Sequence, residues 1–357
     1  MKIVFKIVSA IILTVIFSGC GGDNSYDGEN GLIGTGAGTA IDEAVAGLYA
    51  NVIIADAQAC YADSLVLLNA VQALNSTTDA SALAAAQSAF KALALGYKRV
   101  ESAYVAGYNS DDMRDLADFY IEHFIKSSKS QDIPGDLESV FAGTGSLTKN
   151  SSKGITALEY TLFGDQESST DLLAKMNSAR LESAVIIAQT VSDNLKTVSD
   201  YYHDDGTFLA DSEEAVSALL NVLVDNAYKL KEIRIGDPAG YTVKYKDDPD
   251  ATRLEYYKSI NSLEAVKVIL DTHKRVMGNG LTEISALGNA RSEADAIVTV
   301  LDEAIAVCES YTAALEEGVD SSSTQALYNA AIILQNNYTA LINALNFTQD
   351  IIEADGD

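Results

Sequence analysis

The stretch AIDEAVAGLYANVIIADAQACYADSLVLLNAVQALN, residues 40–75, predicts a long amphipathic helix. Apolar side chains recur in it at intervals of three and four residues, the spacing of a helix with one buried side. They stand at Ala44, Leu48, Val52, Ala55 and Ala59, and again at Leu65, Leu68 and Val71. Strand-like alternation of Val, Ile and Thr is nearly absent elsewhere, and the 357 residues contain only three Pro. The sequence therefore predicts an all-α protein.

Further helices are expected along the rest of the chain, each recognised by its apolar spacing or by a capping residue. Asp79 and Ser110 are plausible N-caps, and Asp211 with Glu214 resembles a capping box. The expected segments are 80–106, 111–128, 155–163, 170–202, 211–233, 251–277, 289–316 and 323–347. Short loops favour antiparallel neighbours, so we expect two antiparallel helical bundles, at 39–205 and 206–357. A single elongated bundle is the alternative.

Residues 1–19 have the form of a bacterial lipoprotein signal peptide. Lys2 and Lys6 precede the apolar residues 7–17, and small residues stand directly before Cys20, as in a lipobox. This pattern implies cleavage before Cys20 and lipidation of that residue; an ordinary signal peptide with an incidental cysteine is the alternative. No later stretch reaches the roughly 18 apolar residues of a membrane span. We therefore expect a cell-envelope protein, at the outer membrane or periplasmic face, anchored by lipid at Cys20.

Composition excludes several classes of protein. The formal net charge is −27, from 24 basic and 51 acidic residues, which argues against binding to nucleic acid or to anionic lipid. Hydrophobic residues make up 48% of the chain, enough for a sizeable core. Residues 20–38 are rich in Gly, Asn and Asp and read as a flexible tether. An oxidising compartment would permit a disulfide between Cys60 and Cys308; two buried thiols are the alternative.

The segment KGITALEYTLFG, residues 153–164, carries the most distinctive chemistry. Thr156 and Glu159 are three residues apart, so they share a face of the predicted helix. Glu159 stands among apolar residues. A carboxylate there must be paired, hydrogen-bonded or metal-bound, or its pKa must rise. A glutamate with a purely structural partner, such as a neighbouring Arg or Tyr, is the alternative.

This segment resembles the signature of the imelysin family, the imelysin-like peptidases of family M75. That signature is Gly-x-His-x-x-Glu followed by an aromatic and apolar run, and Gly154, Glu159 and Tyr160 fit it. Thr156 occupies the histidine position. Other similar segments follow the family's order: 90–104, 230–238, 254–281 and 347–357. The first of them places Glu101 near the site.

The resemblance implies a two-domain all-helical fold with the motif near the interface between the halves. It also implies a periplasmic or outer-membrane location. Members of the family are linked either to peptide cleavage or to iron acquisition. The related iron-uptake proteins are thought to hold metal through the His and Glu of the motif.

The departure at Thr156 changes the expected chemistry. A hydroxyl is a poor substitute for imidazole as a transition-metal ligand. The remaining candidate ligands, Glu159, Glu101 and Thr156, offer only oxygen, which favours iron as Fe³⁺ or another hard cation such as Ca²⁺. His123 is the candidate to replace the missing imidazole. We expect His203, which ends a helix, and His273 to be structural.

Three functions follow from these observations. The leading hypothesis is a non-catalytic envelope protein that binds iron, another metal or another small ligand between the bundles. The first alternative is a metallopeptidase of the M75 type, for which the sequence shows no convincing set of metal ligands. The second is a module that has lost the ancestral site and docks an envelope protein.

Overall fold

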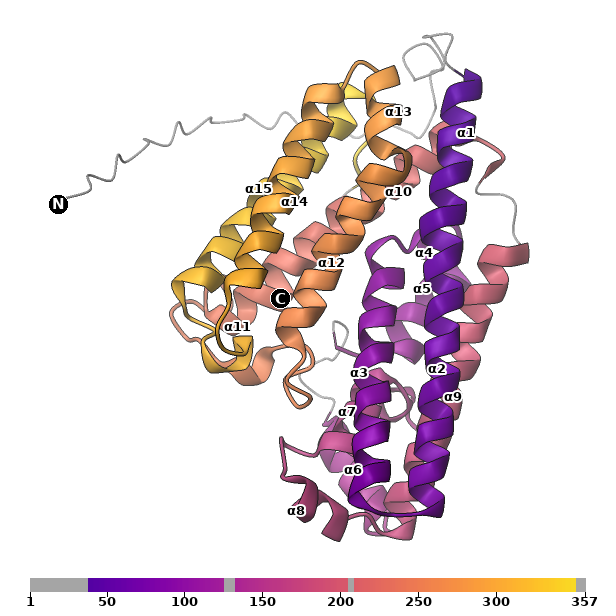
Figure 1. The fold of residues 1–357 in the computed structure, drawn as a ribbon, viewed down its shortest axis with the longest axis vertical. Coiled ribbons are helices and arrows are strands. Elements are labelled where there is room, and N and C mark those ends of the chain that lie inside the picture. The colour runs from indigo at the N-terminus through magenta and orange to yellow at the C-terminus, as the bar shows by residue number, and fades with distance from the viewer. Residues whose placement is uncertain (1–37, 125–131, 205–208, 351–357) are drawn as a thin grey trace, which may run out of the picture.

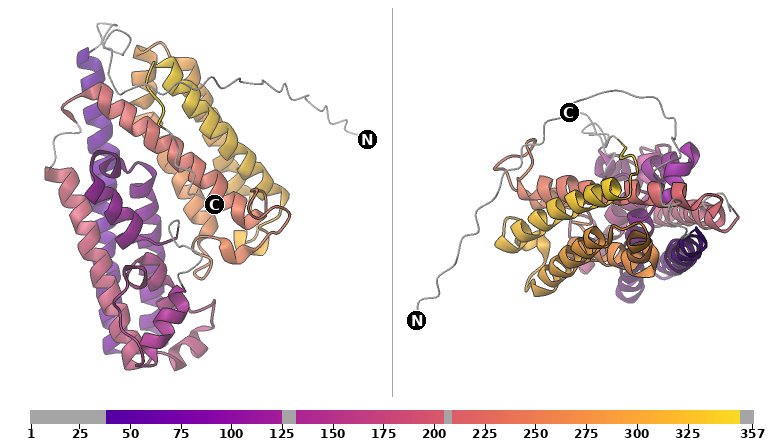
Figure 2. Two further views of the ribbon diagram at one scale, coloured as in Figure 1. Left: turned by 180° about the vertical axis from the view of Figure 1, so that it is seen from behind. Right: turned by 90° about the horizontal axis from the view of Figure 1, so that it is seen from above.

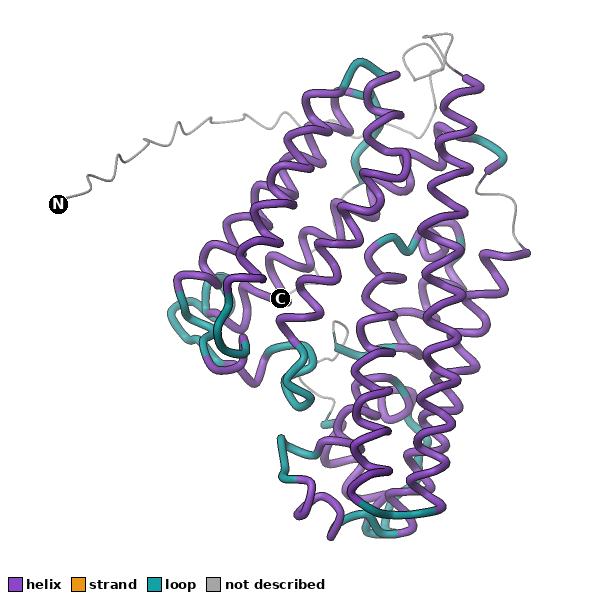
Figure 3. Tube along the Cα trace, viewed as in Figure 1, coloured by secondary structure: helices purple, strands orange, loops and turns teal. Residues whose placement is uncertain are grey.

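The computed structural model describes residues 38–124, 132–204 and 209–350, and within them every regular element is a helix (Figures 1 and 3). The all-α prediction is therefore confirmed. The predicted signal peptide, Cys20, the tether up to residue 37 and the acidic residues 351–357 lie outside the described residues.

The first group of helices is built on the stretch at 40–75. Helix α1 (Gly38–Leu48), a π-helical segment (Tyr49–Ile54) and α2 (Ala55–Ser76) form one continuous helix of 39 residues. Helix α3 (Ala80–Ser102) packs along α2, and α9 (Ser178–Asp204) packs along another side of it.

The π-helical segment changes which side chains of this long helix are buried. A π turn holds one residue more than an α turn, so it shifts the apolar stripe by one position. Leu48 and Val52 are buried as predicted, but after the π turn Ala57 and Cys60 are buried while Ala59 is exposed. Leu65 is 39% exposed. The predicted stripe was thus wrong at Ala59, because of the π turn, and at Leu65, whereas Leu68 and Val71 are buried as predicted.

By length and composition the helix Gly38–Ser76 could also cross a membrane, contrary to the expectation that no such stretch follows the signal peptide. Its buried side chains belong to the main apolar core, where they meet those of α3 and α9. In this structure the helix therefore serves as the central core element of its group.

Short helices complete the first group. They are α4 (Val105–Asn109), α5 (Asp111–Leu116), a π turn (Ala117–Ile121), α6 (Ile133–Phe141), a 3₁₀ turn (Asn150–Lys153), α7 (Ile155–Phe163) and α8 (Ser169–Ala174). The prediction for 155–163 is confirmed. The single helices predicted at 80–106 and 170–202 are each broken into two, and the one predicted at 111–128 ends at Ile121 because the chain is extended at Glu122.

The second group contains α10 (Ser212–Lys229), α12 (Ser262–Val276), α14 (Arg291–Ser310) and α15 (Ser322–Ala344). Helix α15 packs on α14 and α10, and α14 packs on α12. The smaller elements are a π-helical segment (Leu230–Gly236), α11 (Asp237–Ala239), 3₁₀ turns (Ala251–Arg253 and Leu315–Glu317), a π turn (Met277–Leu281) and α13 (Thr282–Leu287). The helix predicted at 251–277 begins only at Ser262.

The two groups lie side by side, the second inclined to the first (Figures 1 and 2). Helix α12 packs on α3, and the main apolar core is continuous between the groups. The division into domains at 205/206 stays a prediction. Cys60 on α2 and Cys308 on α14 are free, buried thiols, the alternative to a disulfide.

The predicted N-caps are all present. Asp79 accepts a hydrogen bond from the backbone N–H of Ala82 at 2.8 Å, and Ser110 accepts one from Met113 at 3.4 Å. The Asp211 carboxylate accepts from the N–H groups of Glu213 and Glu214 at 2.9 and 3.1 Å. Local sequence thus sets the starts of these helices, as expected for residues that satisfy free helical N–H groups.

We predict that Gly280→Ala destabilises the contact between α1 and the turn after α12. Gly280 has φ 150°, and a Cβ there would lie 2.8 Å from the carbonyl oxygen of Ala44. The expected loss in the free energy of unfolding is about 1–3 kcal/mol, measured by urea unfolding. Gly278→Ala is the matched control, because nothing lies within 4 Å of its Cβ position. Equal effects of the two substitutions would contradict this account.

Candidate functional site

The motif helix α7 begins where two segments of backbone come very close. A Cβ on Gly154 would lie 2.7 Å from the carbonyl oxygen of Ile121 and 3.2 Å from Cδ2 of His123. The motif therefore needs glycine at this position for packing, because any side chain would push away the extended chain at 121–123.

The other end of α7 is held by side chains from neighbouring helices. The buried Arg180 of α9 donates from Nε to the carbonyl of Thr161 and from Nη2 to that of Tyr160, both at 3.0 Å. Gln87 of α3 donates to the carbonyl of Leu162 at 2.8 Å. The carbonyl of Tyr160 also accepts the backbone N–H of Gly164 at 2.9 Å, whereas the bonds to Thr161 and Leu162 come from side chains of α9 and α3 at the end of the helix, where carbonyls lack helical donors. The hydroxyl of Tyr160 itself donates to Glu138 at 2.9 Å, so Tyr160 supports the helix.

A cleft of about 610 Å³ lies over α7, between the two groups of helices. Thr156 and Glu159 line it from the first group, as their shared helical face predicts. The second group contributes the end of α10, the loop around residues 242–245 and the segment 252–258. Four tyrosines are among the lining residues: Tyr228, Tyr245, Tyr256 and Tyr257.

Glu159 is 4% exposed, and its carboxylate is held by a single residue of the second group. Oε1 accepts from the backbone N–H of Ser259 at 2.9 Å and from its hydroxyl at 2.7 Å. Burial raises the pKa of Glu159 to about 7, although the two bonds from Ser259 oppose the rise. Tyr256 and Ile260, on either side of Ser259, have φ 61° and 52°, a left-handed backbone that side chains disfavour. The backbone of the second group is thus strained at the residues that place Ser259 against Glu159.

A second set of carboxylates adjoins the cleft, and two of them, Glu122 and Glu255, are among its lining residues. Oxygen atoms of Glu101, Glu122 and Glu255 lie within 4.8 Å of one another. The fully buried ammonium of Lys98 stands among them, 2.6 Å from Glu101 Oε2 and 3.0 Å from Glu122 Oε2, and bonds Glu255 Oε1 as well. Arg234 of the second group completes this carboxylate cage, with Nε 2.7 Å from Glu255 and Nη2 2.6 Å from Glu101.

The cage is close to electrically neutral. Burial disfavours the charged forms, but Arg234 and Lys98 lower the pKa of Glu101 to about 2 and also lower that of Glu255. Burial and the charge of Glu255 raise the pKa of Glu122 well above its usual range, which favours its protonated form. With Glu122 protonated, two positive and two negative charges remain.

These contacts decide how a metal ion could fit. The cage is the only gathering of three possible ligand residues within the described ranges, and an ammonium already fills it. Glu159 and Thr156 offer oxygen to the cleft but belong to no such set. A bare transition-metal ion therefore does not fit a prebuilt site at the motif. Glu101, predicted as a ligand, is committed to Lys98 and Arg234.

The three histidines lie apart from one another. His123 is buried beside Gly154, its Nε2 has no partner among the described residues, and burial lowers its pKa. It is not among the residues that line the cleft, whereas its neighbour Glu122 is. His273 bonds Tyr338 at 3.0 Å and Asn226 at 2.9 Å, and burial lowers its pKa to about 3, as for a structural residue. His203 is exposed near the end of α9.

Sequence reasoning missed five residues of the site: Lys98, Glu122, Arg234, Glu255 and Ser259. A signal was present at Lys98, which lies one helical turn after the apolar Ala94 on α3, because a cation on the buried face of a helix requires partners. Arg234, Glu255 and Ser259 lie in the segments 230–238 and 254–281 that resemble the family, but their roles were missed because they depend on an irregular segment that was expected to be helical.

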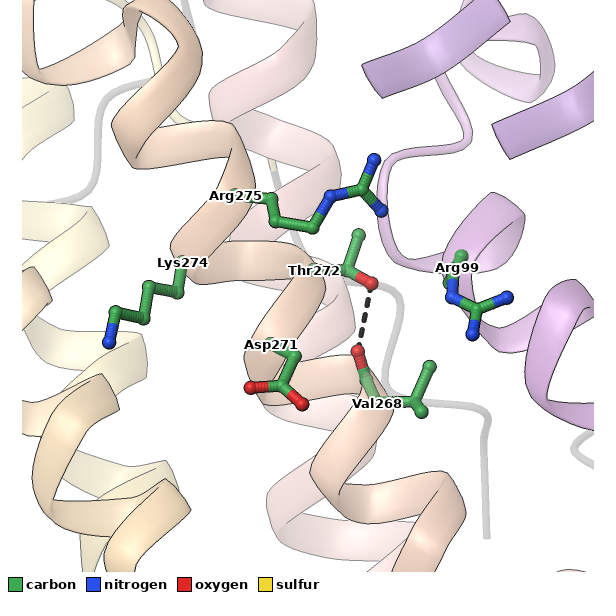
Figure 4. A pocket seen from close by; sticks show the side chains of 6 residues that line it. All are labelled: Arg99, Val268, Asp271, Thr272, Lys274 and Arg275. Atoms are coloured by element: carbon green, nitrogen blue, oxygen red, sulfur yellow. Dashed lines mark hydrogen bonds between the residues drawn. The ribbon is translucent and has the colours of Figure 1, made fainter. Parts of the chain in front are cut away.

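Another crevice, of about 540 Å³, lies between α3 and α12 (Figure 4). Its cations are Arg99, Lys274 and Arg275. Arg275 pairs with Asp56 at 2.9 Å and Lys274 pairs with Asp302, so two of the three are already neutralised. The Thr272 hydroxyl is bonded within α12, to the carbonyl of Val268. This crevice is a weaker candidate than the cleft over α7.

We predict that Glu159 makes folding less favourable as the pH rises from about 4.5 to 7. Its pKa is raised from 4.5 to about 7 in the folded state, so the folded protein binds the proton more tightly. The stabilisation present below pH 4.5 is lost as the pH approaches 7, by up to about 3 kcal/mol. Urea unfolding of wild type and Glu159→Gln at pH 5 and pH 8 measures this. If the free energy of unfolding changed by the same amount between pH 5 and pH 8 in the wild type and the variant, the prediction would be contradicted.

Comparison with known proteins identifies the family and the fold of this chain. Residues 53–345 match the sequence profile of the family Imelysin, peptidase family M75. An imelysin-like protein from Psychrobacter arcticum 273-4 superposes with a TM-score of 0.71 at 16% identity, over 87% of this chain and 97% of that one. A candidate iron-regulated protein A precursor from Parabacteroides distasonis ATCC 8503 gives 0.70 at 15% identity, over 85% and 95%. No curated protein matches the chain with significance. Both likenesses concern the fold, and the profile match shows that this chain belongs to the imelysin family.

Proposed function

We propose that this protein is a non-catalytic binding protein of the bacterial cell envelope, serving the acquisition of iron or another ligand. The cleft over α7 is its binding site, with Glu159 and Thr156 as the groups that meet the ligand. The lipobox at Cys20 supports a lipid anchor, at the outer membrane or the periplasmic face. The name of the Parabacteroides neighbour, an iron-regulated protein, supports the link to iron.

The observation that carries the proposal is the state of Glu159. Within the described residues it accepts two hydrogen bonds from Ser259 and forms no ion pair. Its neighbours Glu101 and Glu255, by contrast, are neutralised by Lys98 and Arg234. A buried carboxylate left without a cation is costly, and coordination to a cationic centre such as an iron ion would remove that cost.

The ligand must bring part of its own coordination. Glu159 and Thr156 supply too few donors to enclose a metal ion, so a hard cation would keep other ligands, such as water or a chelating acid. The tyrosines of the cleft suit a ligand larger than an ion, because they offer apolar faces with polar ends. Chelated iron meets both conditions.

The metallopeptidase alternative has less support. Peptide hydrolysis by a metal requires a firmly held ion that activates water, and His123 does not line the cleft. A module that docks an envelope protein would use the same cleft with a protein group in place of the small ligand.

We predict that Glu159→Gln weakens binding of Fe³⁺, supplied as its citrate complex, by roughly tenfold or more. The measurement is a titration of the mature chain from residue 21, with bound iron determined on the separated protein. The substitution removes a charged oxygen donor from the iron, while the side-chain oxygen of Gln can still accept the two bonds from Ser259.

Glu232→Gln is the matched control, because Glu232 lines the same cleft but is paired with Lys231 at 2.9 Å. It removes the same charge and should change the affinity little. Equal losses in the two variants would show only a general effect of charge. Iron binding unaffected by Glu159→Gln would place any iron elsewhere and contradict the proposal. Chelator-sensitive cleavage of an unfolded protein, lost in Glu159→Gln, would favour the metallopeptidase.

A further inference from the structure

The carboxylate cage has the composition of a hard-cation site. Three carboxylates with oxygens within 4.8 Å of one another are what Ca²⁺ or a similar ion uses. Yet the centre holds the ammonium of Lys98, whose three N–H groups meet the three carboxylates. Lys98 is 0% exposed, so the ammonium is enclosed within the core.

The cage also joins the two halves of the chain. Lys98 and Glu101 belong to α3, and Glu122 to the segment that passes the motif. Arg234 and Glu255 belong to the second group, and each makes ion pairs with residues of α3. Within the described ranges, the buried ion pairs that join α3 to Arg234 and to Glu255 all belong to this cage.

We propose that the Lys98 ammonium takes the place of a metal ion at this junction. It binds the three carboxyl groups that a bound cation would otherwise hold together. It holds three carboxylates from both halves together and closes the cage to metal ions. The connection between the halves, and hence the shape of the cleft beside it, is therefore independent of metal. Glu122 and Glu255 also line the cleft, but this inference goes beyond the proposed function, because its test changes Lys98 and the cage carboxylates and not the binding residue Glu159.

The proposal predicts that removing the ammonium creates a metal site. Lys98→Ala leaves space and uncompensated carboxylates, which Tb³⁺ or Ca²⁺ can occupy in place of the ammonium. Tb³⁺ is a sensitive probe here, because the Lys98 Nζ lies 5.3 Å from the ring centre of Tyr97 and 5.4 Å from that of Tyr256. Excited tyrosines at that distance sensitise terbium emission, and the chain contains no Trp.

The experiment compares variants made in the Glu159→Gln background, so that binding in the cleft does not contribute. Lys98→Ala should gain one tightly bound Tb³⁺ per chain over its parent, at least tenfold tighter than exposed acidic sites and displaced by Ca²⁺. Adding Glu255→Gln should abolish that gain. The thermal midpoint of Lys98→Ala should rise with Ca²⁺, while that of the parent should respond to neither Ca²⁺ nor chelator. A folded Lys98→Ala that gains no Tb³⁺ would overturn the proposal.

A charge-balanced variant keeps the proposal testable if Lys98→Ala does not fold. With Glu122 protonated, Lys98→Met leaves Arg234 as the one cation for the two carboxylates of Glu101 and Glu255. The variant should therefore have a much lower thermal midpoint. Lys98→Met combined with Glu101→Gln leaves Arg234 with Glu255, a balanced pair, and should recover most of that loss. A double variant no more stable than Lys98→Met would show that Lys98 acts by packing and would overturn its role as a cation.

Discussion

The burial of one ammonium among three carboxylates is the constraint on which the centre of this structure depends. Lys98 is fully buried in α3, and a charge in that position requires partners close by. Those partners are Glu101 on α3 itself, Glu122 and Glu255, and Arg234 pairs in turn with Glu101 and Glu255. Glu122 and Glu255, the two partners outside α3, therefore hold different parts of the chain against α3, and both line the cleft.

The irregular backbone around the site follows from this requirement. The helix that the sequence favours after residue 111 stops at Ile121, where the chain runs extended past Gly154 and Glu122 meets Lys98. The segment 251–261 leaves the helical pattern, with left-handed Tyr256 and Ile260, so that Glu255 reaches Lys98 and Ser259 reaches Glu159. Local preference is overridden where buried polar groups must be satisfied.

Two buried carboxylates of similar exposure thus have pKa values shifted in opposite directions. Glu255, 3% exposed, is ionised because Arg234 and Lys98 lower its pKa against the effect of burial. Glu159, 4% exposed, has only neutral donors from Ser259, and burial raises its pKa to about 7. The first is satisfied within the protein, whereas the second is open to a partner from outside, and this contrast separates structure from proposed function.

The sequence by itself determined the helical class, the caps at Asp79, Ser110 and Asp211, the extent of α7 and the placement of Thr156 and Glu159 on one face. These depend on neighbours within a few residues, which periodicity and capping chemistry record. The tertiary structure decided the one-residue shift at the π turn, the position of His123 outside the cleft lining and the pairing of Glu101 with Lys98 and Arg234. Those features arise from contacts between residues as far apart as Lys98 and Glu255, and the spacing of residues along the chain carries no record of such contacts.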